Sequence, residues 1–245
     1  MPEVLAVLPM RGGSKSIPLK SISPLLGRPM CHYTIIEAKK SKLINRFIIY
    51  TGHPQILEVA KQYGVEVPIL EQEEKQEDIS MFRDILDGLL KKENYKPDIV
   101  IHLKATSPLR VVDDIDTAVR MLIDDSEADS VRGVCSPELT PFKMYMYDET
   151  KNKYLQPFLT KEHFQFLGQF RDQYAMPREL FPKVVRHTGI MDVYRCVNIM
   201  EKNTLTGKNI LPYYVDRLRI ASINHADDVP LVEFLLKRQG RDKDD

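Results

Sequence analysis

The start of the chain constrains its fold more than any other stretch. Five apolar residues in a row, Val4–Leu8, are followed at once by a loop rich in glycine and cations. An uninterrupted apolar run of this kind is typical of a strand buried on both faces, as in a parallel sheet. Open α/β sheets bind ligands at the carboxyl ends of their strands, so this loop is a candidate binding loop.

The composition of the loop is that of a phosphate cradle. Gly12 and Gly13 lack a Cβ atom and let backbone N–H groups approach a ligand closely. Arg11, Lys15 and Lys20 bring positive charge that would neutralise a polyanion. The alternative is an ordinary basic surface loop, since short glycine and lysine loops also recur without a ligand.

Buried strands and amphipathic helices alternate along the following part of the chain. Apolar runs predict strands at Phe47–Tyr50, Ile99–Leu103 and Ser130–Cys135, and the apolar spacing over 82–90 predicts an amphipathic helix. A late strand is expected at Val215–Ile223. The alternation predicts an α/β fold with a Rossmann-like, mostly parallel sheet, right-handed crossovers and helices on both faces.

Length, charge and cysteine content exclude several classes of protein. The 245 residues suit one domain with a small appendage. The 35 basic and 35 acidic residues cancel, so no net charge points to nucleic acid or a membrane as partner. No apolar run approaches the roughly 18–20 residues of a membrane span, and the start does not read as a signal peptide. Three cysteines without metal-binding spacing favour a reducing, cytoplasmic setting.

The first loop also resembles the amino-terminal fingerprint of the acylneuraminate cytidylyltransferases, the CMP-sialic acid and CMP-KDO synthetase type of enzyme. The family pattern is I-P-A-R-G-G-S-K-G-I-P-x-K-N, and the matching stretch is Leu8–Lys20. Ser16 and Ser21 stand where the family has Gly and Asn. The resemblance implies one nucleotidyltransferase domain over 1–245, of the nucleotide-diphospho-sugar transferase type. It also implies transfer of CMP from CTP to a nonulosonic sugar acid, of sialic or legionaminic type, with release of pyrophosphate.

The resemblance implies a role for several residues of two loops and for Arg171. Those that would hold the triphosphate and act in catalysis are Arg11, Lys15 and Lys20. Those that would bind the nucleotide are Gly12, Gly13, Ser14, Thr106 and Ser107. Those that would bind the acceptor are Lys104, Arg110 and Arg171.

The second of these loops follows the predicted strand Ile99–Leu103 and resembles the family's Q-P-T-S-P-L-R. Arg110, at its end, would offer a planar fork to a carboxylate or phosphate of the substrate. The alternative is a Ser-Pro turn in which Arg110 pairs with Asp113 or Asp114. Lys104 stands where the family has a sugar-contacting Gln. A cation there suits an acidic or phosphorylated acceptor, and the alternative is that the usual sugar is no longer bound.

The regular alternation stops between about 141 and 183. In the family this region contains an arm that packs against a second subunit, so the resemblance implies a homodimer. An antiparallel extension of the same core is the alternative. A third match, at Arg171–Gln173, Pro177 and Arg186–Tyr194, resembles R-Q-x-L-P…Y-R-x-N-G-x-x-D-V-I, the form found in family members related to legionaminic acid activation.

Three departures fall on residues that the family uses. The family holds Mg²⁺ with two carboxylates of a late I-D-I-D-T element, whereas Ser222 and Asn224 stand at those positions here. Mg²⁺ is therefore expected from the resemblance, although it prefers hard, usually charged, oxygen ligands. Glu71 replaces an Arg that helps to read cytosine, and Thr51-Gly52-His53 replaces S-T-D.

These observations leave three functional hypotheses. The first is a cytidylyltransferase that activates a nonulosonic acid. The second is a catalytically silent nucleotide-binding paralogue, motivated by the uncharged Ser222 and Asn224. The third is a nucleotidyltransferase with an altered base or acceptor, motivated by Glu71 and Lys104.

Overall fold

The computed structural model describes residues 1–14, 16–70, 77–151, 153–159, 162 and 175–242. The chain divides into two compact units, one formed by Met1–Val134 with His187–Asp245 and the other by Cys135–Arg186. The first unit contains the sheet and both candidate loops. The segment at 141–183, predicted to be a dimerisation arm, lies within the second unit.

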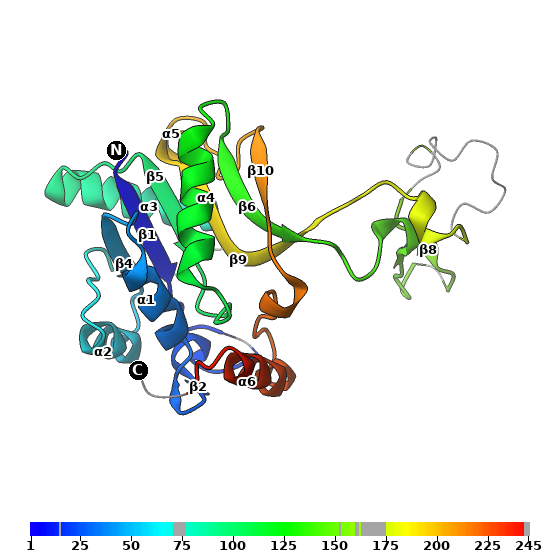
Figure 1. The fold of residues 1–245 in the computed structure, drawn as a ribbon, viewed down its shortest axis with the longest axis horizontal. Coiled ribbons are helices and arrows are strands. Elements are labelled where there is room, and N and C mark those ends of the chain that lie inside the picture. Colours follow the sequence, from blue (N-terminus) through cyan, green and yellow to red (C-terminus); the bar gives the residue numbers. More distant parts are fainter. Residues whose placement is uncertain (15, 71–76, 152, 160–161, 163–174, 243–245) are drawn as a thin grey trace. The chain divides into compact units, whose positions relative to one another are not determined.

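A six-stranded sheet forms the first unit's core. Its strands are β1 (Val4–Pro9), β4 (Arg46–Tyr50), β5 (Ile99–Leu103), β6 (Ser130–Cys135), β9 (Arg186–Arg195) and β10 (Ile210–Tyr214). They lie in the order β10-β6-β9-β5-β1-β4 (Figure 1). β1 is parallel to β4 and β5, and β10 is parallel to β6, whereas β9 is antiparallel to β5. The mostly parallel sheet confirms the predicted fold class.

Helices cover both faces of this sheet. They are α1 (Cys31–Lys40), α2 (Pro54–Gln62), α3 (Asp78–Glu93), α4 (Val112–Asp124), α5 (Cys196–Met200) and α6 (Val229–Arg238). α1 and α4 lie beside each other on one face (Figure 1), and α3 and α5 contact each other on the opposite face. Leu5 and Val7 of β1 pack in the same apolar cluster as α3 and α5. Because both faces of β1 are covered, its apolar run needs no alternation.

The amphipathic pattern predicted over 82–90 is confirmed in α3, where Phe82, Ile85, Leu86 and Leu89 are buried. The helix ends at Asn94, which adopts the left-handed conformation common at helix ends, with φ of 52°. The start of the same helix places Asp78 near the first loop.

The prediction of a strand at Val215–Ile223 is wrong. This segment contains a 3₁₀ turn at Arg217–Arg219, and the last strand of the sheet, β10, precedes it. β10 is an edge strand that pairs with β6 alone, so the missing N–H of Pro212 is tolerated. Other short elements are β2 (Pro24–Leu25) with β3 (Arg28–Pro29), and 3₁₀ turns at Lys20–Ile22 and Ala226–Asp228.

The second unit has a small apolar cluster of its own. The rings of Phe142 and Phe181 stack with 5.1 Å between their centroids, and Met176 packs with them. The unit also contains the short strands β7 (Tyr145–Met146) and β8 (Gln156–Pro157) and 3₁₀ turns at Pro141–Lys143 and Arg178–Leu180. Its large exposed apolar side chains include Leu139, Met146, Tyr147, Tyr154, Leu155 and Phe158. A homodimer through this unit remains a prediction.

Candidate active site

The candidate site lies at the carboxyl ends of β1, β4 and β5, which are parallel neighbours and therefore end at one edge of the sheet. The first loop follows β1, the Thr51-Gly52-His53 turn follows β4, and the second loop follows β5. The first two sequence matches are thus on the same edge of the sheet.

The first loop leaves its backbone donors unused. After the Met10 N–H, which donates to the Tyr50 carbonyl, the N–H groups of Gly12, Gly13 and Ser14 donate to no acceptor among the described residues. Gly13 is exposed and Ser14 half-buried. Backbone N–H groups without protein acceptors can donate to the oxygens of a bound anion.

Two neighbours fix the beginning of this loop. Arg11 Nη2 lies 3.3 Å from Asp78 Oδ1 at the start of α3, and both side chains keep solvent exposure. Gly12 packs so closely on the imidazole of His53 that a Cβ atom would lie 2.6 Å from His53 Cδ2. Gly12 is therefore required by the packing of the loop, and His53 forms part of the loop's support.

The end of the first loop is joined to the C-terminal part of the chain. Lys20 Nζ and Ser16 Oγ each donate to the carbonyl oxygen of Asn224, both at 2.6 Å. Burial lowers the pKa of Lys20, and the nearby carboxylate of Asp228 partly counters this effect. These contacts place the segment with the lost aspartates directly beside the loop.

The second loop is tied to the same segment and to β9. The Thr106 carbonyl accepts a hydrogen bond from the Ile223 N–H at 2.9 Å. Ser107 is buried, and its hydroxyl donates to the Gly189 carbonyl at 3.2 Å. Lys104 is half-buried, and its Nζ would lie 3.6 Å from a Cβ atom placed on Gly189. Thr106 and Lys104 therefore remain available to a ligand, whereas Ser107 positions the loop.

The expectation that the Arg110 guanidinium is accessible to a substrate is wrong. The residue has no exposed surface. Its Nε donates to the Ile190 carbonyl at 2.5 Å, Nη1 to Thr34 Oγ1 at 3.0 Å and Nη2 to the Lys104 carbonyl at 3.2 Å. Burial lowers the pKa of Arg110 to about 9. The guanidinium holds the second loop on α1 and β9 from inside the protein and cannot meet a substrate there.

Neither Asp113 nor Asp114 accepts any of these hydrogen bonds from Arg110, so the alternative pairing is not observed either. Asp114 instead accepts two bonds from Arg219 Nη1, at 2.6 and 2.7 Å, and one from the Tyr213 hydroxyl at 2.7 Å. These contacts anchor the segment after β10 to the start of α4.

A pair of hydrogen-bond donors on β6 and β9, Arg132 and His187, was not foreseen from the sequence. Asp192 is 1 % exposed and accepts hydrogen bonds at 2.9 Å from Arg132 Nε and from His187 Nε2. Burial would raise the pKa of Asp192, but these two hydrogen bonds hold it well below its usual range. The side chains of Arg132 and His187 stay about one-third exposed. A charged residue within the buried strand Ser130–Cys135 was the signal that could have drawn attention to Arg132.

His102 lies beneath this part of the site. It faces Asp192 in the β5–β9 register and is 5 % exposed, and its Nδ1 has no hydrogen-bond partner among the described residues. Burial, and then the charge of Lys104, lower the pKa of His102 to about 4. His102 is thus a neutral imidazole at pH 7.

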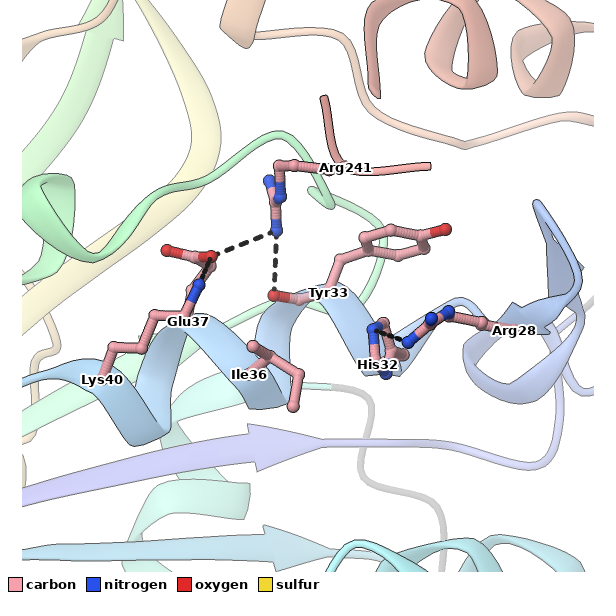
Figure 2. A pocket seen from close by; sticks show the side chains of 7 residues that line it. All are labelled: Arg28, His32, Tyr33, Ile36, Glu37, Lys40 and Arg241. Atoms are coloured by element: carbon pink, nitrogen blue, oxygen red, sulfur yellow. Dashed lines mark hydrogen bonds and ion pairs between the residues drawn. The ribbon is translucent and has the colours of Figure 1, made fainter. Parts of the chain in front are cut away.

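Arg241, beyond α6, braces the opposite side of the second loop. Figure 2 shows it reaching α1, where Nη2 donates to the Tyr33 carbonyl at 3.3 Å and lies 3.6 Å from Glu37 Oε1. The surrounding cavity has a volume of about 70 Å³. That is well below the roughly 300–1,000 Å³ of small-molecule sites, so Arg241 acts here as a structural contact.

The donor set does not fit a Mg²⁺ ion held by protein carboxylates. Asn224 Nδ2 donates to Ser222 Oγ at 3.3 Å, and neither side chain carries charge. The nearest carboxylate, Asp228, uses Oδ2 to accept the N–H groups of Asn224 and His225, both at 2.8 Å. Within the described part of the chain, no three acidic, His or Cys side chains are grouped for metal binding.

Three predicted positions lie outside the described residues: Lys15, Glu71 and Arg171. Their assignments remain predictions. No helix in the described ranges is long and apolar enough to cross a membrane.

Comparison with known proteins relates this edge to nucleotide chemistry. Residues 5–156 match a family model described as "Cytidylyltransferase". The chain is 26% identical over 243 residues to "Post-translational flagellin modification protein B" of Campylobacter coli, covering 98% of this chain and 97% of that protein.

Two further relatives match over a shorter length. The "CMP-N,N'-diacetyllegionaminic acid synthase" of Legionella pneumophila is 36% identical over 121 residues, which cover 48% of this chain and 52% of the relative. The "Pseudaminic acid cytidylyltransferase" of Campylobacter jejuni is 32% identical over 108 residues, which cover 43% of this chain and 47% of the relative. These alignments span about half the length of those two relatives.

A solved structure shares the fold over nearly the whole chain. It is a CMP:2-keto-3-deoxy-manno-octonic acid synthetase complexed with CTP, with a TM-score of 0.68 and 16% sequence identity. It covers 97% of this chain and 99% of its own. At this identity the likeness concerns the fold alone.

Proposed function

Because the chain belongs to the cytidylyltransferase family, we propose that it transfers CMP from CTP to a nonulosonic sugar acid of the sialic or legionaminic type. Family membership makes the chain a nucleotidyltransferase, and the relatives named for legionaminic and pseudaminic acid support a sugar acid as acceptor. The solved structure with the same fold is complexed with CTP, which supports CTP as the donor.

One observation carries the proposal. The N–H groups of Gly12, Gly13 and Ser14 are without acceptors in the described structure, and the cations Arg11 and Lys20 flank them. This arrangement suits a triphosphate, because backbone donors and fixed positive charge both favour phosphate oxygens. We assign Lys15 to the same role from its place in the loop.

In the proposed reaction, an acceptor hydroxyl oxygen attacks the α-phosphorus of CTP in line with the leaving group. The new P–O bond forms as the bond to the β-phosphate oxygen breaks. Pyrophosphate leaves with the bonding electrons, and the hydroxyl proton passes to solvent. Little covalent chemistry is required of the protein, so positioning and charge neutralisation supply most of the rate enhancement.

The acceptor's carboxylate is assigned to the edge next to β9. Lys104 lies over Gly189, and Arg132 and His187 are held in place by the buried carboxylate of Asp192. Three donors of this kind suit an anionic group of the acceptor. Thr106 lies on the same loop as Lys104 and is assigned to the nucleotide.

The second unit is proposed to form a homodimer with its copy. Several apolar side chains among its described residues are exposed, with Leu139 71% and Phe158 52% exposed. Exposed apolar surface on a small unit is typical of a protein-binding site. Light scattering of the purified protein would measure its mass, and a monomer at micromolar concentration would contradict this assignment.

The test of the proposed function is pyrophosphate release by the purified protein supplied with Mg²⁺. CTP, UTP, ATP and GTP are each combined with sialic, legionaminic and pseudaminic acids and with KDO. Turnover is expected with CTP and one of the nonulosonic acids. Turnover with KDO alone would show that the acceptor is not a nonulosonic acid. Turnover with another nucleotide would show that CTP is not the donor.

Lys104→Gln provides the variant arm of this test. We expect KM for the acceptor to rise about tenfold, the effect of losing one charged hydrogen bond, while KM for CTP is unchanged. Nucleotide-induced thermal stabilisation without turnover in any combination would favour the silent paralogue.

A further inference from the structure

The segment Ser222–Asn224 lies between the two loops of the proposed site. One carbonyl oxygen, that of Asn224, accepts hydrogen bonds from Lys20 Nζ and Ser16 Oγ at 2.6 Å each. One residue earlier, the Ile223 N–H donates to the Thr106 carbonyl at 2.9 Å. The segment therefore joins the triphosphate loop to the second loop through its backbone rather than through its side chains.

The side chains of this segment that face the loop bring no negative charge. The side chains of Ser222 and Asn224 are neutral and hydrogen-bond to each other. Lys20 contacts a neutral carbonyl and has no carboxylate within ion-pair distance among the described residues, although Asp228 acts on it from further away. A triphosphate in the loop would thus meet the ammonium group of Lys20. If carboxylates stood at this place instead, a cation would have to lie between them and the phosphates.

We propose that the Lys20 ammonium takes the place of a protein-bound divalent cation at Ser222–Asn224. In the described part of the chain no carboxylates are grouped to hold such an ion, and any Mg²⁺ arrives and departs with the triphosphate. This inference rests on the proposed function of the site. Its physical basis is charge complementarity, since carboxylates beside phosphate oxygens repel them unless a cation lies between, whereas an ammonium attracts them directly.

The inference predicts that CTP binding depends weakly on Mg²⁺. Calorimetric titration of the full-length protein with CTP, in Mg²⁺ and in EDTA, measures this without turnover. The dissociation constants in the two buffers should agree within about tenfold for the wild type.

The double variant Ser222→Asp, Asn224→Asp supplies the matched comparison. Two added carboxylates should weaken binding of metal-free CTP more than about tenfold, and Mg²⁺ should restore it. Mn²⁺ titration followed by electron paramagnetic resonance should detect ion binding in the double variant with CTP. At about 1 mM Mn²⁺, a weak carboxylate site would be occupied. The wild type without nucleotide should nevertheless leave the Mn²⁺ signal unchanged at this concentration.

Two variants test Lys20 itself. Lys20→Met should weaken CTP binding about tenfold or more in both buffers, and Lys20→Arg, which keeps the charge, should retain most of it. Thermal unfolding of each variant checks that it is folded.

Each outcome decides the inference. A wild type that binds CTP more than about tenfold more weakly in EDTA overturns it and leaves the proposed function standing. Mn²⁺ binding to the nucleotide-free wild type, or unchanged affinity in Lys20→Met, overturns it as well. No CTP binding in either buffer would reject the proposed function and the inference together.

Discussion

Arg241 Nη1 donates to the carbonyl oxygen of Pro108 at 2.8 Å, and to that of Arg110 at 3.1 Å. The guanidinium therefore ties the end of the chain to the second loop of the site. Its Nη2 donates to the Tyr33 carbonyl on α1. Because carbonyls are acceptors only, a cation that donates to three of them stabilises the loop without a matching carboxylate at each.

Arg241→Ala is expected to loosen the second loop while the sheet stays intact. Loss of these hydrogen bonds from a largely buried guanidinium should cost about 2 kcal/mol in the free energy of unfolding. KM for the acceptor should rise more than KM for CTP, since the first loop keeps its own supports. Urea unfolding and steady-state kinetics measure both effects. Arg238→Ala, at an exposed position of α6, is the control.

Arg110→Lys tests the buried position of Arg110. Three separate guanidinium nitrogens donate to Ile190, Thr34 and the Lys104 carbonyl. The single ammonium nitrogen of a lysine cannot take all three places, so we expect a loss of about 2–4 kcal/mol in the free energy of unfolding. Arg120→Lys, with a side chain 58% exposed on α4, should change stability by less than about 0.5 kcal/mol. A fully stable Arg110→Lys with impaired acceptor binding would instead support the ligand-binding fork.

Gly12→Ala tests the packing of the first loop on His53. The added Cβ atom would lie 2.6 Å from the imidazole, so the loop or the ring must move. We expect CTP binding to weaken about tenfold. His53→Ala removes the obstacle, and the double variant should recover most of the loss, which a double-mutant cycle by calorimetry measures. Equal losses in the single and double variants would show that Gly12 is needed for another reason.

His102 makes stability depend on pH in a defined window. Its pKa in the folded protein is about 4, below the usual 6.5, so the unfolded chain takes up a proton first as the pH falls. The contribution of neutral His102 to the free energy of unfolding is complete above pH 6.5 and declines as the pH falls towards 4. The loss from this group is on the order of 3 kcal/mol.

Urea unfolding at several pH values checks this expectation. His102→Gln, which does not titrate, should show a shallower decline than the wild type between pH 6.5 and 4. An identical decline in the wild type and in His102→Gln would remove His102 from this role.

The parts of the fold that the sequence predicted correctly are those that depend on local pattern. The apolar run Val4–Leu8 is buried on both faces, and the stripe along α3 faces the core. Both follow from the spacing of apolar residues, which is fixed before any tertiary contact forms. The prediction of a strand at Val215–Ile223 was wrong. The preceding strand β10 already occupies the edge of the sheet, so this half-apolar segment has no strand to pair with.

The sequence alone therefore determined the fold class and the position of the first loop after β1, and its resemblance to the family implied that Ser222 and Asn224 stand at two carboxylate positions. Only the tertiary structure decided what surrounds each polar side chain. It buried Arg110, grouped Arg132 and His187 on Asp192, and joined Lys20 to Asn224 across 204 residues. The physical reason is that burial and hydrogen-bond partners depend on segments far apart in the chain, whereas strand and helix periodicity depends on neighbours.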